Sequence, residues 1–154
     1  MSVSERLAGL GLRLPAPAAP VANYLPYKLA GSMLYLSGMI PLLDGEPYRT
    51  GRLGAGVSLE EGIECARLCC LSALAWAKDA LDGNLERIAG VIRVRGFVAS
   101  TPDFFEQPKV LNGCSDLLLE VFGERGSHTR AAVGSVALPL NVPVEIDFLF
   151  SVDS

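Results

Sequence analysis

The C-terminal stretch from Thr129 to Phe150 constrains the fold more than any other part of the sequence. It contains two apolar segments of strand length, joined by a short turn at 138–141. Residues two apart in a strand lie on the same face. The second segment therefore has one ordinary core face, whereas Glu145 and Asp147 occupy the other. These carboxylates either face bulk water or line a cleft that Arg130, at the head of the first segment, also reaches.

Two helices are predicted upstream of this stretch. Ser58-Leu59-Glu60-Glu61 is a capping box, and apolar residues at helical spacing follow it until Asp82-Gly83-Asn84. This pattern predicts an amphipathic helix over about 58–82. Pro108 suits the first turn of a second helix, and Gly123 suits its C-terminal end.

Strand-length segments precede and separate these helices, at 27–32, 33–37 and 88–99. In the third of them, Ile92, Val94 and Val98 are expected on one face. The predicted order is strand, strand, helix, strand, helix, strand, strand. Right-handed crossovers place both helices on one face of the sheet. The other face is too apolar to be left to water, so we expect it to pack against copies of the same chain.

Length indicates a single domain over residues 1–154, in which residues 1–20 form a short helical or irregular arm. The Gly/Pro-rich segment 41–56 is expected to be a loop. The arm lacks the basic start and apolar block of a secretory signal, and no apolar run is long enough to span a membrane. We therefore expect a cytoplasmic protein without a membrane partner.

Composition weighs against two classes of site. The formal net charge is -4 and no Lys/Arg cluster is present, which argues against a nucleic-acid partner. No CxxC pair and no second histidine exist, so no metal site is expected, and His128 is expected in a loop near Arg130. The cysteines are expected to pack as small buried residues in a reducing compartment: Cys65, Cys69, Cys70 and Cys114.

Three residues stand out as candidates for binding or catalysis. Arg130 could bind a ligand carboxylate through two parallel hydrogen bonds, because the small side chains that follow it leave space for a ligand. It could instead pair with a surface acid. Glu145 could orient or deprotonate a water, or it could be a structurally paired acid. Asn112 and Gly113 are poor helix formers, which indicates a packing or ligand reason, or a helix that begins later.

The pattern of these residues resembles the Rid family, also called YjgF-like and once labelled L-PSP endoribonucleases. The resemblance covers roughly residues 20–152. It is carried by Tyr27, the segment Leu36-Ser37-Gly38-x-Ile40-Pro41, Asn112, and the block Arg130-x-x-Val133-x-x-x-x-Leu138-Pro139-x-x-Val142-x-Val144-Glu145-Ile146.

The resemblance implies an α+β fold of the bacillus-type chorismate-mutase-like class. In this fold a mixed β-sheet carries two helices on one face, and a homotrimer holds three clefts between its subunits. The implied activity is hydrolysis of reactive enamine or imine intermediates, such as 2-aminoacrylate, to a 2-keto acid and ammonia. No cofactor is implied.

The resemblance also implies a role for individual residues. Arg130 would clamp the substrate carboxylate and Glu145 would hold the attacking water. Ala132 stands where the family archetype has a cysteine, two residues after the arginine. The lining of the cleft would be completed by Tyr27, Ser37, Gly38 and Asn112.

Three functions stay open at this point. The first is an imine or enamine deaminase acting on a small carboxylate substrate. The second is a non-catalytic module that binds 2-keto acids or related carboxylates in the same cleft. The third is an endoribonuclease, suggested by the old family label, against which the acidic balance and the single histidine weigh.

Overall fold

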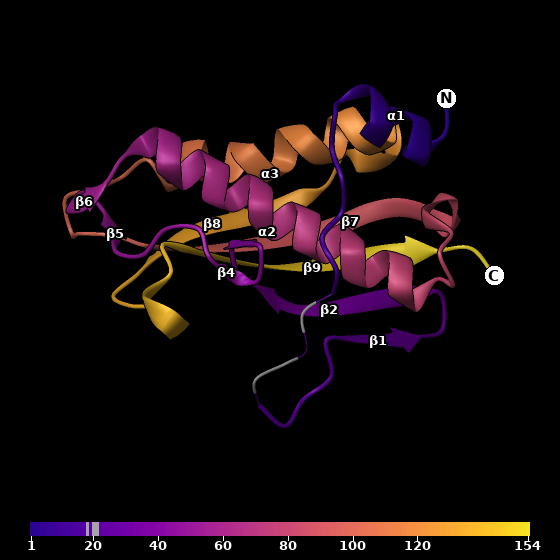
Figure 1. The fold of residues 1–154 in the computed structure, drawn as a ribbon, viewed down its shortest axis with the longest axis horizontal. Coiled ribbons are helices and arrows are strands. Elements are labelled where there is room, and N and C mark those ends of the chain that lie inside the picture. The colour runs from indigo at the N-terminus through magenta and orange to yellow at the C-terminus, as the bar shows by residue number, and fades with distance from the viewer. Residues whose placement is uncertain (18, 20–21) are drawn as a thin grey trace.

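A computed structural model of the chain describes residues 1–17, 19 and 22–154 (Figure 1). One five-stranded sheet has the order β1-β2-β9-β7-β8. The pair β7 and β8 is parallel, and the other neighbours are antiparallel. The architecture is therefore the expected α+β fold with a mixed sheet. The strands are β1 (Tyr27–Ala30), β2 (Met33–Met39), β7 (Ile88–Ala99), β8 (Thr129–Ser135) and β9 (Val144–Val152).

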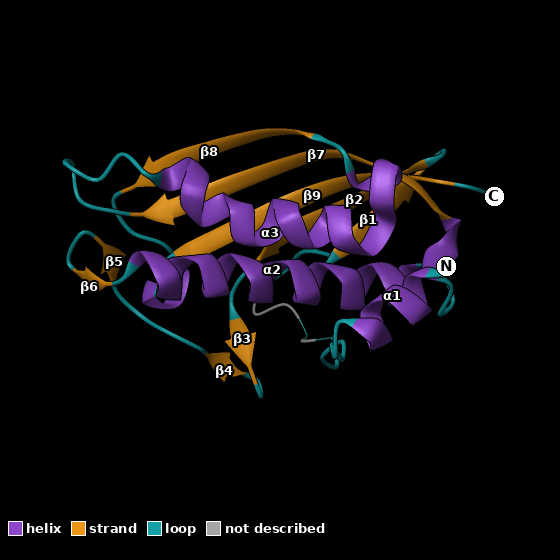
Figure 2. Ribbon diagram, turned by 90° about the horizontal axis from the view of Figure 1, so that it is seen from above, coloured by secondary structure: helices purple, strands orange, loops and turns teal. Residues whose placement is uncertain are grey.

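The described residues form three α-helices on one side of the sheet: the two predicted from the long apolar patterns, and a third in the N-terminal arm, which was expected to be helical or irregular (Figure 2). α2 (Leu59–Ala80) begins at the predicted capping box, and α3 (Gln107–Phe122) ends at Gly123. The additional helix, α1 (Val3–Gly9), has a capping box of its own and packs on α3. Short 3-10 helices are η1 (Leu85–Arg87), η2 (Gly123–Gly126) and η3 (Pro139–Asn141).

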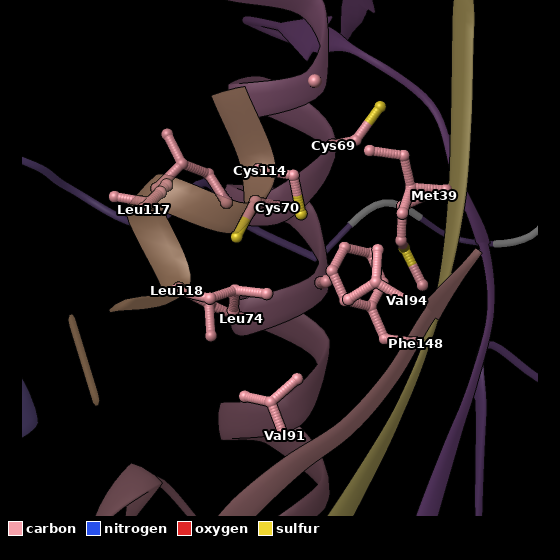
Figure 3. Packing of buried hydrophobic residues seen from close by; sticks show 14 of the residues in the cluster. Met39, Cys69, Cys70, Leu74, Val91, Val94, Cys114, Leu117, Leu118 and Phe148 are labelled. Atoms are coloured by element: carbon pink, nitrogen blue, oxygen red, sulfur yellow. The ribbon is translucent and has the colours of Figure 1, made fainter. Parts of the chain in front are cut away.

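The hydrophobic core fills the layer between the helices and the sheet. The core face of β9 contributes Val144, Ile146, Phe148 and Phe150, each no more than 2% exposed. Cys70 and Cys114 lie among leucines of α2 and α3 (Figure 3). Burial raises the pKa of the Cys65 thiol to about 12, and raises those of the Cys69 and Cys114 thiols well above their ordinary value. The free thiols therefore serve as small apolar packing groups.

One face assignment made from the alternation in β7 is wrong. The pairing of β7 with β9 shifts register between Val91 and Arg93. Val91 is 3% exposed and occupies the core, whereas Ile92 is 40% exposed. A bulge inserts one residue into the strand and reverses the faces on its two sides. Val94 and Val98 share one face, as expected, and that face is the core side of the strand.

The segment 41–56, expected as a loop, contains two small sheets that are fixed to the rest of the molecule. The Gly51 amide donates to the Asn141 carbonyl (2.9 Å), and the Thr101 amide donates to the Leu53 carbonyl (3.0 Å). The strands are β3 (Leu42–Leu43) paired with β4 (Glu46–Pro47), and β5 (Arg52–Leu53) paired with β6 (Gly56–Val57).

None of the helices in residues 1–17, 19 and 22–154 combines the length and apolar character that a transmembrane helix needs.

Candidate functional site

Arg130 lies on the edge strand β8 and points toward the helix layer. Its register partner on β7 is Val94, which also pairs with the core residue Phe148, so all three share the helix-covered face. The guanidinium reaches α3 across the edge of the sheet. Nη1 donates to Asn112 Oδ1 (2.9 Å) and to Ser115 Oγ (3.1 Å), and Nη2 donates to the Pro108 carbonyl (3.3 Å).

The partners of Arg130 are all neutral. No ion pair to a carboxylate is found for this guanidinium within the described ranges. An arginine carries five N–H donors. Three of them make the hydrogen bonds to α3, which leaves two for an incoming group. Two N–H donors on one guanidinium are what a carboxylate accepts in bidentate geometry.

Asn112 and Gly113 both lie inside α3, because the helix begins at Gln107. The alternative of a helix that begins later is therefore wrong. A Cβ atom on Gly113 would lie 2.1 Å from the Ile63 carbonyl oxygen, so glycine permits the close crossing of α2 and α3. The neighbouring Asn112 turns its amide oxygen to Arg130. Packing against α2 explains Gly113, and the hydrogen bond from Arg130 explains Asn112.

Ser115 extends this polar cluster to the loop before β8. Its Oγ lies 2.8 Å from His128 Nε2, and His128 Nδ1 lies 2.6 Å from the Gly126 carbonyl oxygen. His128 is thus a loop residue near Arg130, as predicted, whereas Ser115 was not singled out from the sequence. Its position three residues after Asn112, on the same helical face, is the signal that could have found it. A surface pocket of about 370 Å³ is lined by Asn112, Ser115, Asp116, Leu119, Ser127, His128 and Arg130.

Glu145 lies on the opposite face of the sheet. It pairs with Phe97, which pairs in turn with Val133. Its carboxyl group rests against Gly38, where an added Cβ atom would lie only 2.9 Å from Glu145 Cδ. Burial, followed by the nearby Asp147 charge, raises the pKa of the Glu145 carboxyl above its ordinary value. Burial and a like charge both disfavour the ionised form.

Asp147 and Tyr27 have partners within the chain. Asp147 accepts a bidentate set of hydrogen bonds from Arg95, with distances between 2.9 and 3.1 Å. It is therefore a structurally paired acid. The Tyr27 hydroxyl donates to Asp79 Oδ2 (3.1 Å), and its ring centroid lies 6.0 Å from that of Trp76. The Tyr27 side chain thus packs against α2.

Ser37 and Gly38 form an irregularity in β2 beside Glu145. The register of β2 with β9 shifts between Leu36 and Met39, which accommodates these two residues. The Ser37 hydroxyl donates to the Leu25 carbonyl (2.6 Å). Gly38, without a side chain, leaves room for the Glu145 carboxyl group. The two residues therefore shape the backbone around that carboxyl.

Apart from Tyr27, whose side chain packs against α2, the predicted site residues fall into two groups. We call Asn112, Arg130 and Ala132 the anchor half, and Ser37, Gly38 and Glu145 the water half. Ala132 shares the helix-covered face with Arg130, because it pairs through Gly96 with the core residue Ile146.

The two halves lie on opposite faces of the sheet in one chain. Arg130 and Glu145 are two strands and three residue positions apart, which corresponds to roughly 14 Å between their Cα atoms. The expectation that both residues reach one cleft is therefore not met within a single chain. Within residues 1–17, 19 and 22–154, no group of three or more His, Cys, Asp and Glu side chains could hold a metal ion.

Comparisons with known proteins identify the family of this chain. A family model described as "YjgF/chorismate mutase-like, putative endoribonuclease" matches residues 4–152. Protein TCP17 of Trypanosoma cruzi is 43% identical over 153 residues, which cover 99% of this chain and 95% of that protein. The crystal structure of Atu1372 from Agrobacterium tumefaciens, a protein of unknown function, is 43% identical with a TM-score of 0.92. It covers 99% of this chain and 92% of that chain.

A more distant structure, E. coli TdcF with bound serine, shares the fold. It is 22% identical with a TM-score of 0.63, and covers 90% of this chain and 94% of that chain. The sheet, its helix layer and these matches define an α+β domain of the YjgF/chorismate-mutase-like class. The chain belongs to the Rid family, also called YjgF or L-PSP.

Proposed function

We propose that this protein hydrolyses small enamine or imine intermediates that carry a carboxylate, giving a 2-keto acid and ammonia. The observation that carries the proposal is the set of hydrogen-bond partners of Arg130. Neutral acceptors hold its guanidinium in place, no carboxylate neutralises it among the described residues, and two N–H donors remain. A preorganised, unpaired guanidinium beside a pocket is suited to anchoring a substrate carboxylate.

The chemistry needs little beyond positioning and one base. The carbon of a C=N bond is electrophilic, so an oriented water can add to it once a base takes a proton. Glu145, when ionised, would accept that proton as the C–O bond forms. The proton then passes to the nitrogen, which gives a carbinolamine. The hydroxyl proton is transferred to the nitrogen as the C–N bond breaks, so that ammonia leaves and the carbonyl of the 2-keto acid forms. An enamine enters this sequence after it tautomerises to the imine. No cofactor takes part in these steps.

We further propose that the site is completed between subunits of a homotrimer. The anchor half and the water half of one chain cannot act on one small substrate, because they lie on opposite faces of the sheet. Apposition of the anchor half of one subunit to the water half of a neighbour would provide both groups. Cyclic symmetry would then give three equivalent clefts. The serine bound to TdcF supports an amino-acid-like ligand on this fold.

The proposal is tested by ammonia release from 2-aminoacrylate and longer 2-imino acids, generated in situ by an amino-acid oxidase or dehydratase. Arg130→Ala should lower kcat/KM by at least about 100-fold, because the substrate is no longer held in a reactive position. Arg52→Ala is the matched control, since its exposed side chain lies outside both halves. Wild-type rates in Arg130→Ala would contradict the proposal.

The same geometry favours a second candidate, a module that binds 2-keto acids without turnover. Its two remaining Arg130 donors would bind the carboxylate in the same way. Saturable binding of pyruvate in calorimetry, lost in Arg130→Ala and without ammonia release from any imine, would favour this function. Endoribonuclease activity is expected to be absent, since the net charge is -4 and the chain has one histidine. An RNase-free preparation tests that expectation.

A further inference from the structure

The hydrogen bonds that hold Arg130 continue through Ser115 to His128, and their direction can be assigned. The Gly126 carbonyl only accepts, so His128 Nδ1, at 2.6 Å, must carry the hydrogen. In a neutral imidazole, Nε2 then presents a lone pair. The Ser115 hydroxyl therefore donates to Nε2 over 2.8 Å. Its oxygen lone pairs remain free to accept from Arg130 Nη1 over 3.1 Å.

This chain of hydrogen bonds is built on rigid supports. Ser115 is 8% exposed and lies in the middle of α3. At its other end, Gly126 is buried, and a Cβ atom there would lie 2.3 Å from the Leu118 carbonyl oxygen. The turn that supplies the terminal carbonyl is thus packed directly on α3. Both ends of the Ser115–His128 link are held against the same helix.

We propose that Ser115 and His128 form a positioning pair that fixes the orientation of the Arg130 guanidinium. The inference rests on the proposed role of Arg130 as the carboxylate anchor. Arginine has many rotamers, and holding one of them in advance removes that entropy cost from substrate binding. Asn112 and Ser115 take both hydrogens of Nη1, so neither can rotate into the pocket. The two remaining N–H donors of Arg130 are then held in one fixed orientation for a ligand.

A nucleophilic role for the pair does not fit the same contacts. The Ser115 oxygen is largely buried and already accepts from Arg130. Ser115 also sits well inside α3, where backbone N–H groups are used by the helix and cannot stabilise an oxyanion. Positioning requires only the hydroxyl and the imidazole acceptor that are present.

Two substitutions of His128 test the roles of its two ring nitrogens separately. His128→Asn keeps an amide donor near the place of Nδ1 and removes the acceptor for Ser115. His128→Gln extends an amide to the place of Nε2 and retains an acceptor there. His128→Asn should raise KM for 2-imino acids, or the Kd for pyruvate, about tenfold, the loss expected when the one hydrogen bond that orients the Ser115 hydroxyl is removed. Ser115→Ala should behave like His128→Asn, kcat should change little, and His128→Gln should restore most of the wild-type affinity.

A double-mutant cycle distinguishes positioning from a general loosening of the fold. Adding His128→Asn to Arg130→Ala should change affinity and rate by no more than about twofold, because the group being positioned is already gone. Additive losses in the double variant would overturn the positioning role. So would wild-type KM and Kd in His128→Asn. If Arg130→Ala itself retains wild-type turnover and binding, the proposed function fails instead.

One arm of the test does not depend on activity. Crystal structures of wild type and His128→Asn should show one Arg130 conformer in the first and several in the second. The same single conformer in both proteins would overturn the positioning role, whatever reaction the protein catalyses.

Discussion

At Glu145, two neighbours set the behaviour of one carboxyl group. Gly38 provides the space in which the group is partly buried, and Asp147 adds a like charge from the same face of the strand. Both effects favour the protonated form. Asp147 itself is held by Arg95, so the two acids, although only two positions apart, have different roles. Asp147 is structurally paired, and Glu145 is the carboxyl group that we propose as the base.

The raised pKa of Glu145 predicts a pH dependence. The proposed base must be ionised, so the acid limb of the kcat/KM profile should lie above the ordinary carboxyl pKa of 4.5. Asp147→Asn should move this limb to lower pH, because a like charge is removed and Arg95 loses its counter-ion. Glu145→Gln should remove both the limb and most of the activity. A wild-type limb at or below the ordinary pKa would contradict the assignment.

The raised pKa of Glu145 also determines how its contribution to stability changes with pH. Folding raises the pKa of Glu145, so the folded state binds the proton more tightly than the unfolded state does. The contribution of Glu145 to stability is therefore largest below pH 4.5. It falls as the pH rises from 4.5 through the folded-state pKa. Activity and stability thus respond to this carboxyl in opposite directions.

The sequence singled out individual candidate residues more readily than it predicted where they lie relative to one another. A small-residue context identified Arg130, and poor helix propensity identified Asn112, and the structure brings these two into contact. Alternation within a strand gives relative faces only inside that strand. Arg130 and Glu145 lie on different strands, and their relation depends on the register that β7 sets between them. That register is a property of the folded sheet.

At the scale of elements, the crossing of α2 and α3 limits what position 113 can hold. An added Cβ atom on Gly113 would meet the Ile63 backbone carbonyl at 2.1 Å, and backbone cannot move without shifting a helix. Gly62, in α2, faces side chains and not backbone. Its nearest neighbours are the ends of the Leu53 and Val110 side chains, at 3.0 and 3.3 Å, which can rotate.

These two glycines form a matched pair for a stability measurement. Gly113→Ala should lower the free energy of unfolding by about 3 kcal/mol, through overpacking of the helix interface. Gly62→Ala should change it by no more than about 1 kcal/mol, because the gain in helix propensity offsets a small rearrangement. Urea unfolding at one fixed protein concentration measures both. Equal effects of the two substitutions would contradict the argument.

Long elements could be predicted because their signals are local. The capping box at Ser58 and the positive φ of 62° at Gly123 mark helix ends, as expected from their residue types. The bulge in β7 depends instead on pairing with β9, and it leaves Ile92 exposed while Val94 is buried. The short strands of 41–56 depend on hydrogen bonds to distant residues such as Thr101 and Asn141. Contacts of that kind leave no periodic pattern in the sequence.

At the scale of the whole molecule, the helix-free face of the sheet resembles an interface. The side chains on this face form rows across β2, β9 and β7. One row consists of Tyr35, Leu149 and Arg93. Tyr35 and Val133 on this face are each 46% exposed in the single chain. Arg93 Nε on the same face is buried without a hydrogen-bond partner in the described part of the chain. Apolar side chains beside a paired Arg95 and Asp147 suit a specific contact better than contact with water.

We therefore expect wild-type protein to sediment at three times the chain mass of 16.3 kDa. Tyr35→Glu should shift it toward the single-chain mass, because three like charges would be brought into an apolar contact. Leu10→Glu is the control, since that side chain is 37% exposed but lies at the end of α1, away from this face. If the site is shared between subunits, Tyr35→Glu should also lose turnover while retaining its helical circular dichroism. A fully active single-chain species would show that one chain suffices and would contradict the shared cleft.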